Sequence, residues 1–358
     1  MSKKIVAVIF GGKSGEHEVS LVSAASVLRE IPRDKYEAVE VGIDKEGRWY
    51  RGEGVMSALT AGSVDGLEAV SFEKALEGCD IAFPVLHGPF GEDGTIQGLF
   101  EMLGMAYVGC GVLASSACMD KIICKDVLAQ AGVPVVPYVS FLRSEWETGS
   151  DKWIARVDKE IDYPCFVKPS NMGSSVGITK VADSNGIKEA IDLACKFDSR
   201  ILVEKAVNAR EIECAVLGND EPEAAELGEI LVGGEFYDYN DKYVDGKSST
   251  QVPVEDLNDD KKSEIGDLCV RAYKAMDCSG LSRVDCFLDR DSGDIYLNEI
   301  NTLPGFTSIS MYPKMWQASG VTYPELIDRL IQLGFQRADE RSKNQISFDS
   351  GSNWFKAS

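Results

Sequence analysis

The alternation of strand-like and helix-like segments in the first third of the chain constrains its fold most. Residues 5–10 (IVAVIF) form an apolar, β-branched run that ends at two glycines, and residues 18–30 then have a helical pattern. Residues 36–43 and 80–86 are further strand candidates, and residues 95–103 are helix-like. Strands that alternate with helices build parallel sheets covered by helices on both faces. We therefore predict that the chain begins with an α/β domain.

The segments that follow have a different character. Residues 112–131 predict one long helix, because Gly132 closes the pattern and Pro134 lies just beyond it. The polar stretch at residues 144–152 predicts a loop, and the aperiodic residues 338–358 predict a mobile tail. Between them, strands are expected at residues 165–168, 177–181 and 201–206, with a helix at residues 186–197, and residues 211–217 begin a third region.

Two apolar runs near the C-terminal end are joined by a turn-rich link at residues 290–294, which predicts a β-hairpin. Strand side chains alternate between faces, so Arg283 and Asp285 share one face of the first run, and Glu299 and Asn301 share one face of the second. Pairing of the runs would place three oxygen ligands beside a guanidinium. Oxygen ligands of this kind suit Mg²⁺. An ordinary solvated hairpin face is an equally good interpretation of these residues alone.

Composition restricts the class of partner. The 358 residues suggest two or three domains, and a hydrophobic content of 44% supports a well-buried core. The net charge of −21 argues against a nucleic acid or an anionic membrane as partner, and no apolar run approaches membrane-spanning length. With no leader-like start either, we expect a cytoplasmic location. Ten cysteines without a Cys-x-x-Cys pair predict reduced, mostly buried thiols.

Two loops could cover a substrate. Residues 168–177 (KPSNMGSSVG) form a glycine-rich and serine-rich loop between two short strand candidates, with Lys168 at its base. Backbone amides in such a loop can surround phosphate oxygens, although a plain surface turn is the alternative. Its GSSVG portion also matches a hydrolase nucleophile pattern, but a strand follows it and both histidines precede it, which argues against a hydrolase. Residues 235–243 predict either an aromatic hairpin or a lid.

Two further loops follow strand candidates directly. Residues 11–20 carry Glu16 and His17, and residues 87–94 begin with His87. Ligands of open α/β sheets bind at the carboxyl ends of the strands, which is where both loops are expected to lie. We therefore predict that these loops take part in binding a small molecule.

Taken together, these segments resemble the D-alanine–D-alanine ligase family of ATP-grasp enzymes. The resemblance runs from about residue 5 to residue 335, and it rests on six motifs in order: GGKSGEHEVS (11–20), HGPFGEDGTIQG (87–98), MDK (119–121), PCFVKPSNMGSSVG (164–177), SRVD (282–285) and NEINTLPGFTS (298–308). It implies an ATP-grasp fold with an N-terminal Rossmann-like α/β domain. The implied domains are residues 1–115, 116–207 with the phosphate flap, and 208–335 with the metal sites, followed by a flexible tail at 336–358.

The resemblance also implies which residues bind ATP and metal. Lys121 and Lys168 would contact phosphates, residues 204–207 would hold adenine, and Glu211 would hold the ribose. Two Mg²⁺ ions, or Mn²⁺ in their place, would be held by Asp285, Glu299 and Asn301. The full set implied for ATP is Lys121, Lys168, Ser174, Ser175, Glu204, Lys205, Val207, Glu211 and Lys242.

The substrate residues follow from the same resemblance. Glu16, assisted by His87, would pair with the ammonium group of the first D-alanine, and Ser310 would contact the carboxylate of the second. Arg283 and the backbone amide of Gly305 would stabilise the developing oxyanion. Tyr243 would bond Ser174 and, with Glu16, close the site.

The implied reaction is the ATP-dependent ligation of two D-alanines through an acyl phosphate, for peptidoglycan synthesis, by a homodimer. Alternatives within the family are D-serine and, less favoured, D-lactate as second substrate, since the loop signature Tyr237-Asp238-Tyr239 with Lys242 and Tyr243 is intact. Ile309 stands where family members often carry histidine, which leaves the second substrate open. An inactive ATP-binding homologue is the alternative outside the class, although no metal ligand or phosphate lysine is missing.

Overall fold

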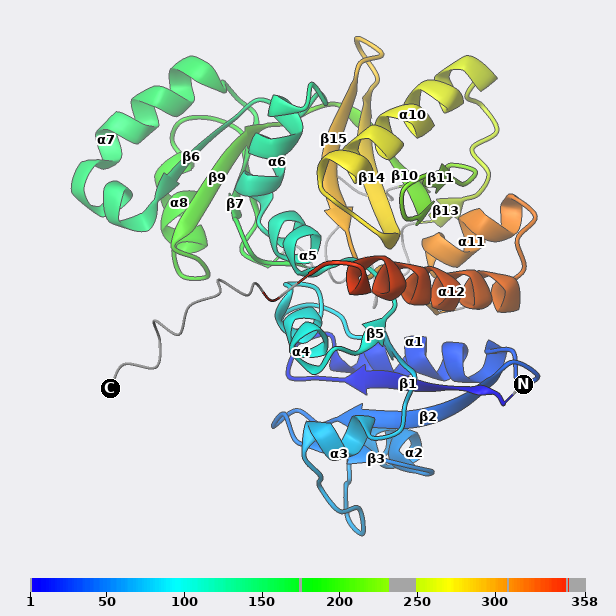
Figure 1. Ribbon diagram of the computed structural model, residues 1–358. Helices are drawn as coiled ribbons and strands as arrows, with labels where there is room; N and C mark the ends of the chain where they lie inside the picture. Colours follow the sequence, from blue (N-terminus) through cyan, green and yellow to red (C-terminus); the bar gives the residue numbers. More distant parts are fainter. Residues whose placement is uncertain (1, 174–175, 232–248, 308, 346, 348–358) are drawn as a thin grey trace.

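The computed structural model describes residues 2–173, 176–231, 249–307, 309–345 and 347, and contains three separate β-sheets (Figure 1). The first sheet has the strand order β3-β2-β1-β4-β5, with β1, β2, β4 and β5 parallel and β3 antiparallel at the edge. Its strands are β1 (Lys4–Gly11), β2 (Tyr36–Ile43), β3 (Trp49–Arg51), β4 (Ile81–Pro84) and β5 (Ala106–Tyr107). The helices along this part of the chain are α1 (His17–Glu30), α2 (Val55–Thr60), α3 (Phe72–Leu76) and α4 (Thr95–Leu103).

Strand β1 shows that the first sheet is buried on both faces, as the sequence predicted. Val6, Val8 and Phe10 pack into one core cluster, whereas Ala7 and Ile9 pack into another. Alternate residues of a strand point to opposite faces, so both faces are covered.

The second sheet is antiparallel, in the order β6-β9-β7-β8, and carries the central part of the chain. Its strands are β6 (Tyr138–Leu142), β7 (Cys165–Pro169), β8 (Thr179–Val181) and β9 (Arg200–Lys205), and the helices of this part of the chain are α7 (Arg143–Glu160) and α8 (Ile187–Ala194).

The third sheet is also antiparallel, in the order β13-β12-β10-β14-β15, with β11 beside β10. Its strands are β10 (Ala209–Gly218), β11 (Glu223–Ala224), β12 (Gly228–Leu231), β13 (Ser249–Gln251), β14 (Gly280–Asp289) and β15 (Ile295–Asn301). The helices of this part of the chain are α10 (Asp259–Ala275), α11 (Met311–Ala318) and α12 (Tyr323–Ser342).

Helix α12 joins the first and third sheets, since it lies between them in Figure 1 and its buried residues share one core cluster with both. A Cβ on Gly334 would lie 2.8 Å from the carbonyl oxygen of Tyr107, so this glycine lets α12 pack directly on β5. The helix continues to Ser342, and the tail predicted from residue 336 therefore starts too early. Arg337 explains why: its guanidinium lies 4.0 Å from the ring centroid of Tyr107 and donates to Ser279 Oγ at 2.9 Å.

The single helix predicted at residues 112–131 is wrong, because the chain breaks at Asp120 into α5 (Val112–Met119) and α6 (Lys121–Gln130). Asp120 has an extended backbone, and its carboxylate accepts from the backbone amides of Ile122 at 3.1 Å and Ile123 at 3.0 Å. These amides lack intrahelical partners, so the aspartate caps a new helix. The same carboxylate accepts from Ser170 Oγ at 2.7 Å and pairs with Arg200 at 2.5 Å.

Replacing Asp120 by alanine is therefore expected to destabilise the protein by about 2–4 kcal/mol, because it removes a helix cap and leaves Arg200 and Ser170 without their shared acceptor. Urea denaturation would measure this change in the free energy of unfolding. The exposed Asp151 on α7 is a matched control, and its alanine variant should differ from the parent by less than about 0.5 kcal/mol. Equal effects at the two positions would contradict the capping role.

The loop predicted at residues 144–152 is also wrong, since these residues lie inside α7. Trp146 and Trp153 are buried and pack on Phe141 with ring centroids 5.9 and 4.8 Å apart. Gly149 has non-helical backbone angles and kinks the helix between them. Burial of two tryptophans thus offsets the polar local sequence.

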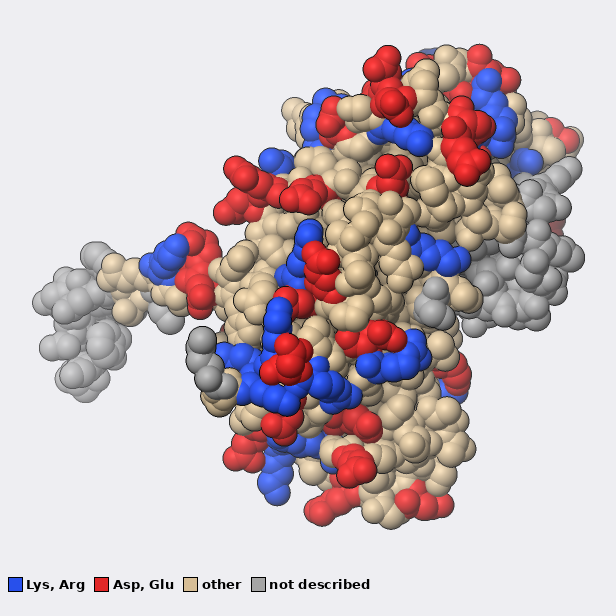
Figure 2. All heavy atoms as spheres, turned by 90° about the vertical axis from the view of Figure 1, so that its right-hand side faces the viewer, with Lys and Arg blue, Asp and Glu red and all other residues tan. Residues whose placement is uncertain are grey.

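None of the described helices is long and apolar enough to span a membrane. On the face shown in Figure 2, acidic side chains are interleaved with basic ones over the described surface.

Candidate functional site

The predicted hairpin is confirmed, and it aligns the three predicted metal ligands. Strands β14 and β15 pair Arg283 with Asn301 and Asp285 with Glu299. Asn301 Nδ2 donates to Asp285 Oδ2 at 3.0 Å, so the two side chains share one face. The register shifts after Asp285, where Cys286 pairs with Leu297. This bulge keeps the hydrophobic side chains of β15 in the core while Glu299 and Asn301 stay at the site.

Glu213 on β10 extends this row of acidic residues. Register pairs Glu213 with Asp285 and Asp285 with Glu299, across three neighbouring strands. Among the described residues, no group of three or more His, Cys, Asp or Glu side chains is arranged to hold a metal ion. The amide group of Asn301 lies beside this row, because its nitrogen donates to Asp285, and a cation already lies within the row.

That cation is Arg283. Its Nε and Nη2 donate to the two oxygens of Asp285 at 2.7 Å each, and its Nε lies 3.2 Å from Glu213 Oε2. Burial lowers the pKa of the Arg283 guanidinium, but attraction by Asp285 and Glu213 outweighs burial and raises that pKa well above its usual value. The site therefore keeps a fixed positive charge beside the acidic row.

A group of lysines lies on the side of the central sheet. Lys121 Nζ donates to the carbonyl oxygen of Met172 in the predicted flap at 2.8 Å. Lys168 pairs with the buried carboxylate of Glu204. Burial lowers the pKa of Lys121, while Glu299 raises it and Lys168 lowers it further. The influence of Glu299 on Lys121 connects this group to the hairpin.

Glu204 is expected to make stability depend on pH. Burial raises the pKa of Glu204, but attraction by Lys125 and Lys168 outweighs burial and lowers that pKa from 4.5 to about 2. Glu204 thus binds a proton more weakly when folded than when unfolded. Its contribution is complete above the unfolded pKa and is lost as the pH falls from about 4.5 towards 2.

The measurement is the difference in the free energy of unfolding between the parent protein and Glu204→Gln. We expect the parent to be the more stable at about pH 6 and the difference to shrink by about pH 3. A difference that is the same at both pH values would show that the carboxylate charge is not what stabilises this position.

The predicted substrate residues gather around three loops. A Cβ on Gly88, which has a φ of +73°, would lie 2.8 Å from Glu16 Oε2, and a Cβ on Gly173 of the flap would lie 4.0 Å from it. His87 lies beneath them, with Nε2 3.1 Å from Ser23 Oγ and Nδ1 3.2 Å from the carbonyl oxygen of Leu303. A glycine is needed at position 88, because a side chain there would displace the Glu16 carboxylate and would have to adopt a positive φ.

The third loop brings Gly305 to Ser310. A Cβ on Gly305 would lie 2.9 Å from Ser310 Oγ, which accepts from the backbone amide of Thr307 at 3.0 Å. Ser23 also accepts from the amide of Phe306 at 3.3 Å, so this loop is tied to α1 and to His87. The residues predicted to bind substrate near the N-terminus and near the C-terminus are thereby brought together.

Other predicted residues stand as follows. Lys205 is exposed, Val207 is half-buried, and Glu211 is half-buried on β10 opposite Phe287. Ser174, Ser175, Lys242 and Tyr243 lie outside the described residues, as does the predicted lid at 235–243.

The sequence interpretation missed Lys125 and Glu213. Their signals are spacings: Lys125 lies one helical turn after Lys121, and Glu213 alternates with Glu211 on one face of β10.

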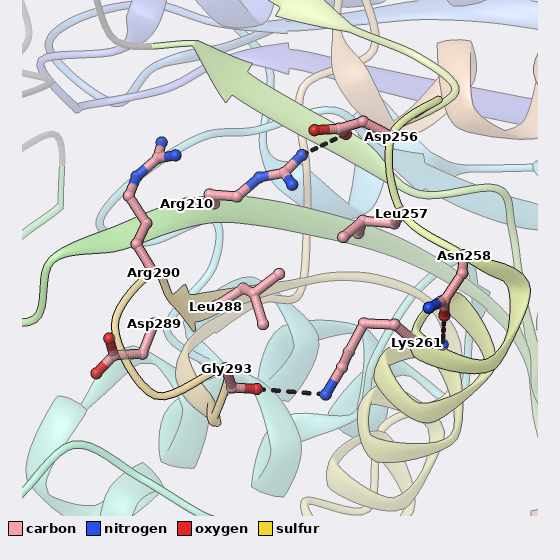
Figure 3. A pocket seen from close by; sticks show the side chains of 9 residues that line it. All are labelled: Arg210, Asp256, Leu257, Asn258, Lys261, Leu288, Asp289, Arg290 and Gly293. Carbon is pink, nitrogen blue, oxygen red and sulfur yellow. Dashed lines mark hydrogen bonds and ion pairs between the residues drawn. The ribbon is translucent and has the colours of Figure 1, made fainter.

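A separate pocket of about 430 Å³ lies beside the β14–β15 turn (Figure 3), and none of the predicted site residues line it. Arg210 in this pocket is already paired with Glu229 at 2.5 Å and Asp256 at 2.7 Å. Lys261 donates to the carbonyl oxygen of Gly293. We therefore take the region between the hairpin, the lysines and the Glu16 loop as the candidate site.

Comparison with known families gives two matches. Residues 5–110 match the family model described as the D-ala D-ala ligase N-terminus, and residues 127–332 match the one described as the D-ala D-ala ligase C-terminus.

Individual relatives match over nearly the whole chain. The D-alanine–D-alanine ligase of Acetivibrio thermocellus is 45% identical, covering 95% of this chain and 98% of the relative, and that of Thermoanaerobacter pseudethanolicus is 47% identical, covering 96% and 99%. Among solved structures, the D-alanine–D-alanine ligase from Coxiella burnetii has a TM-score of 0.82 at 34% identity, covering 96% and 97%. The VanG D-Ala:D-Ser ligase from Enterococcus faecalis has a TM-score of 0.82 at 38% identity, covering 93% and 100%.

Proposed function

Because the chain belongs to the D-alanine–D-alanine ligase family of ATP-grasp enzymes, we propose that it joins two D-alanine molecules to D-alanyl-D-alanine and converts ATP to ADP and phosphate in doing so. The observation that carries this proposal is the alignment of Asp285, Glu299 and Asn301 beside Arg283, in a chain similar to these ligases over almost its full length. The product is a building block of peptidoglycan.

The chemistry requires activation of a carboxylate. A carboxylate does not acylate an amine in water, so the γ-phosphoryl group of ATP is first transferred to the carboxylate of one D-alanine. Such a transfer needs positioning and neutralisation of charge more than covalent help. Lys121 and Lys168 supply positive charge to the phosphates, and Arg283 with the Gly305 amide stabilises the oxyanion when the second amine attacks and phosphate leaves.

The substrates are positioned by residues from the N-terminal part and the C-terminal part of the chain. Glu16 pairs with the ammonium group of the first D-alanine, with His87 fixing the loop beside it. Ser310 contacts the carboxylate of the second. The flap, with Ser174 and Ser175, and the loop with Lys242 and Tyr243 exclude water from the acyl phosphate, which would otherwise hydrolyse.

The donor set suits Mg²⁺. Asp285, Glu299 and the amide oxygen of Asn301 are hard oxygen ligands on one face, and Asn301 is oriented because its nitrogen donates to Asp285. Bound there, two Mg²⁺ ions, or Mn²⁺, would neutralise phosphate charge. Arg283, held by Asp285 and Glu213, would supply positive charge beside them.

D-Serine as second substrate is the competing activity, since one similar structure is a D-Ala:D-Ser ligase. The test measures phosphate release and product mass with Mg-ATP and D-alanine, then with equal D-serine or D-lactate added. ADP, phosphate and D-alanyl-D-alanine as main products would support the proposal. A dominant mixed product would replace it with the D-serine or D-lactate activity, and absence of turnover despite ATP binding would favour an inactive homologue.

A homodimer is part of the proposal. Helices α4 and α5 pack together and expose four large apolar side chains, of which Met102 is 90% and Leu113 is 65% exposed; the others are Leu103 and Val112. Exposed apolar patches of this kind mark interfaces.

Changing both Met102 and Leu113 to lysine should disrupt the dimer, and light scattering should then measure the mass of a monomer. Leu193→Lys on α8 is the control and should leave the dimer intact. A dimer that persists in the double variant would exclude this surface.

We further propose that the three sheets mark domains at residues 1–115, 116–207 and 208–335, and that the protein is cytoplasmic. All ten cysteines are free thiols, and ATP is the co-substrate, both of which fit a reducing, ATP-containing compartment. The proposed partners are D-alanine and ATP, and nucleic acid and membranes are not among them.

A further inference from the structure

Lys125 carries a buried charge, and the proposed reaction gives this residue no role. It is 1% exposed and lies on the buried face of α6 with Ile122 and Leu128, where the helical spacing would ordinarily place an apolar residue. Burying an ammonium group is costly unless a partner compensates it. The partner therefore indicates what the lysine does.

That partner is Glu204, which is also 1% exposed. Lys125 Nζ lies 3.1 Å from Glu204 Oε2, while Lys168 Nζ pairs with the other oxygen, Oε1. One carboxylate is thus shared by two ammonium groups, which come from α6 and from β7. Figure 1 shows α6 beside the sheet that contains β7 and β9.

Lys125, Lys168 and Glu204 form a charged triad, and its net charge decides how strongly it attracts a phosphate ligand. Without Lys125, Lys168 and Glu204 would form a neutral pair. Both carboxylate oxygens of Glu204 could then bind the Lys168 ammonium and compete with the phosphate for it. With Lys125, two positive charges face one negative charge, so the triad carries a net charge of +1. A buried ion pair contributes little net stability compared with apolar packing, so stability alone is a weak reason for a lysine at this position.

We propose that Lys125 is a positioning residue for ATP: it neutralises Glu204 permanently, so that the charge of Lys168 remains available to a phosphate group of the nucleotide. This inference rests on the proposed function, which assigns Lys168 to phosphate. Lys125 itself does not touch the nucleotide. It acts through the carboxylate that it shares with Lys168.

The first experiment compares Lys125→Met with the parent. Methionine fills a similar volume without charge, and we expect the Kd of a non-hydrolysable ATP analogue with Mg²⁺, measured by titration calorimetry, to rise about ten-fold or more. The KM for ATP should rise in parallel, while the KM for D-alanine changes less than about two-fold. Lys188→Met is the control, because it removes an exposed lysine from α8 and should leave both constants unchanged.

The second experiment repeats Lys125→Met on a Glu204→Gln background. Glutamine needs no counter-ion, so the loss caused by Lys125→Met should fall below about two-fold there, whereas a packing defect would cost the same on both backgrounds. Lys125→Arg, which keeps the charge, should bind the analogue within about three-fold of the parent, and it provides the test if the methionine variant does not fold.

The outcomes separate this inference from the proposed function. If the parent lacks ATP-dependent D-alanine ligation, the proposed function fails. If the parent is active, unchanged ATP affinity in Lys125→Met, equal losses on both backgrounds, or an arginine variant as weak as the methionine variant would each overturn the role of Lys125.

Discussion

Glu299→Ala is expected to lower kcat by roughly a thousand-fold or more, because it removes a carboxylate that pairs in register with Asp285, that attracts the Lys121 ammonium, and that we propose as a ligand of Mg²⁺. The fold should remain intact, with a loss in the free energy of unfolding of about 1 kcal/mol or less, since the side chain is only half-buried. Phosphate release with saturating Mg-ATP and D-alanine measures the first quantity, and urea denaturation measures the second.

Asp291→Ala is the matched control, because Asp291 is an exposed carboxylate at the tip of the same hairpin. It should turn over like the parent. A second readout is Mn²⁺ binding followed by electron paramagnetic resonance in the presence of the ATP analogue, which Glu299→Ala should weaken. Near-normal turnover of Glu299→Ala would refute the metal assignment.

Arg283→Met is expected to impair both catalysis and stability. Loss of the guanidinium removes the charge proposed to stabilise the oxyanion, so kcat should fall by about a hundred-fold to a thousand-fold. It also leaves the carboxylates of Asp285 and Glu213 close together without their shared cation. Removing the cation from this partly buried charge cluster is expected to cost about 3 kcal/mol, which denaturation would measure.

Arg283→Lys separates the two effects. Lysine keeps the positive charge but cannot donate to both oxygens of Asp285 from two nitrogens, so stability should recover more than kcat does. The matched surface change is Arg156→Met, which removes an exposed guanidinium from α7. If Arg283→Met kept normal kcat while losing stability, Arg283 would be a structural counter-ion only.

Much of the site could be predicted from the sequence because it depends on local patterns. Alternation along β14 and β15 places Asp285 with Arg283 and Glu299 with Asn301, and the glycine-rich loops after strands place Glu16 and His87 at a sheet edge. The identities of these residues then point to phosphate and carboxylate chemistry, which the similarity to D-alanine–D-alanine ligases supports.

Errors arose where a long-range contact overrode local sequence. Residues 144–152 are polar but helical, because Trp146 and Trp153 pack on Phe141 from the neighbouring strand. Asp120 ends one helix and caps the next, since its carboxylate is held by Ser170 and Arg200. Neither partner can be identified from nearby residues.

The sequence alone therefore determined the α/β character of the first domain, the hairpin and the kinds of residue at the site, since strand periodicity and chemical type are local properties, while six motifs in order indicated the family and its fold. Only the tertiary structure decided which charges share a partner. Glu204 was expected beside adenine, yet it also holds Lys168 and Lys125, which come from separate elements. The bulge after Asp285 likewise depends on pairing between strands. Contacts of this kind arise when distant segments are buried together, because a buried charge must find a counter-ion wherever the fold supplies one.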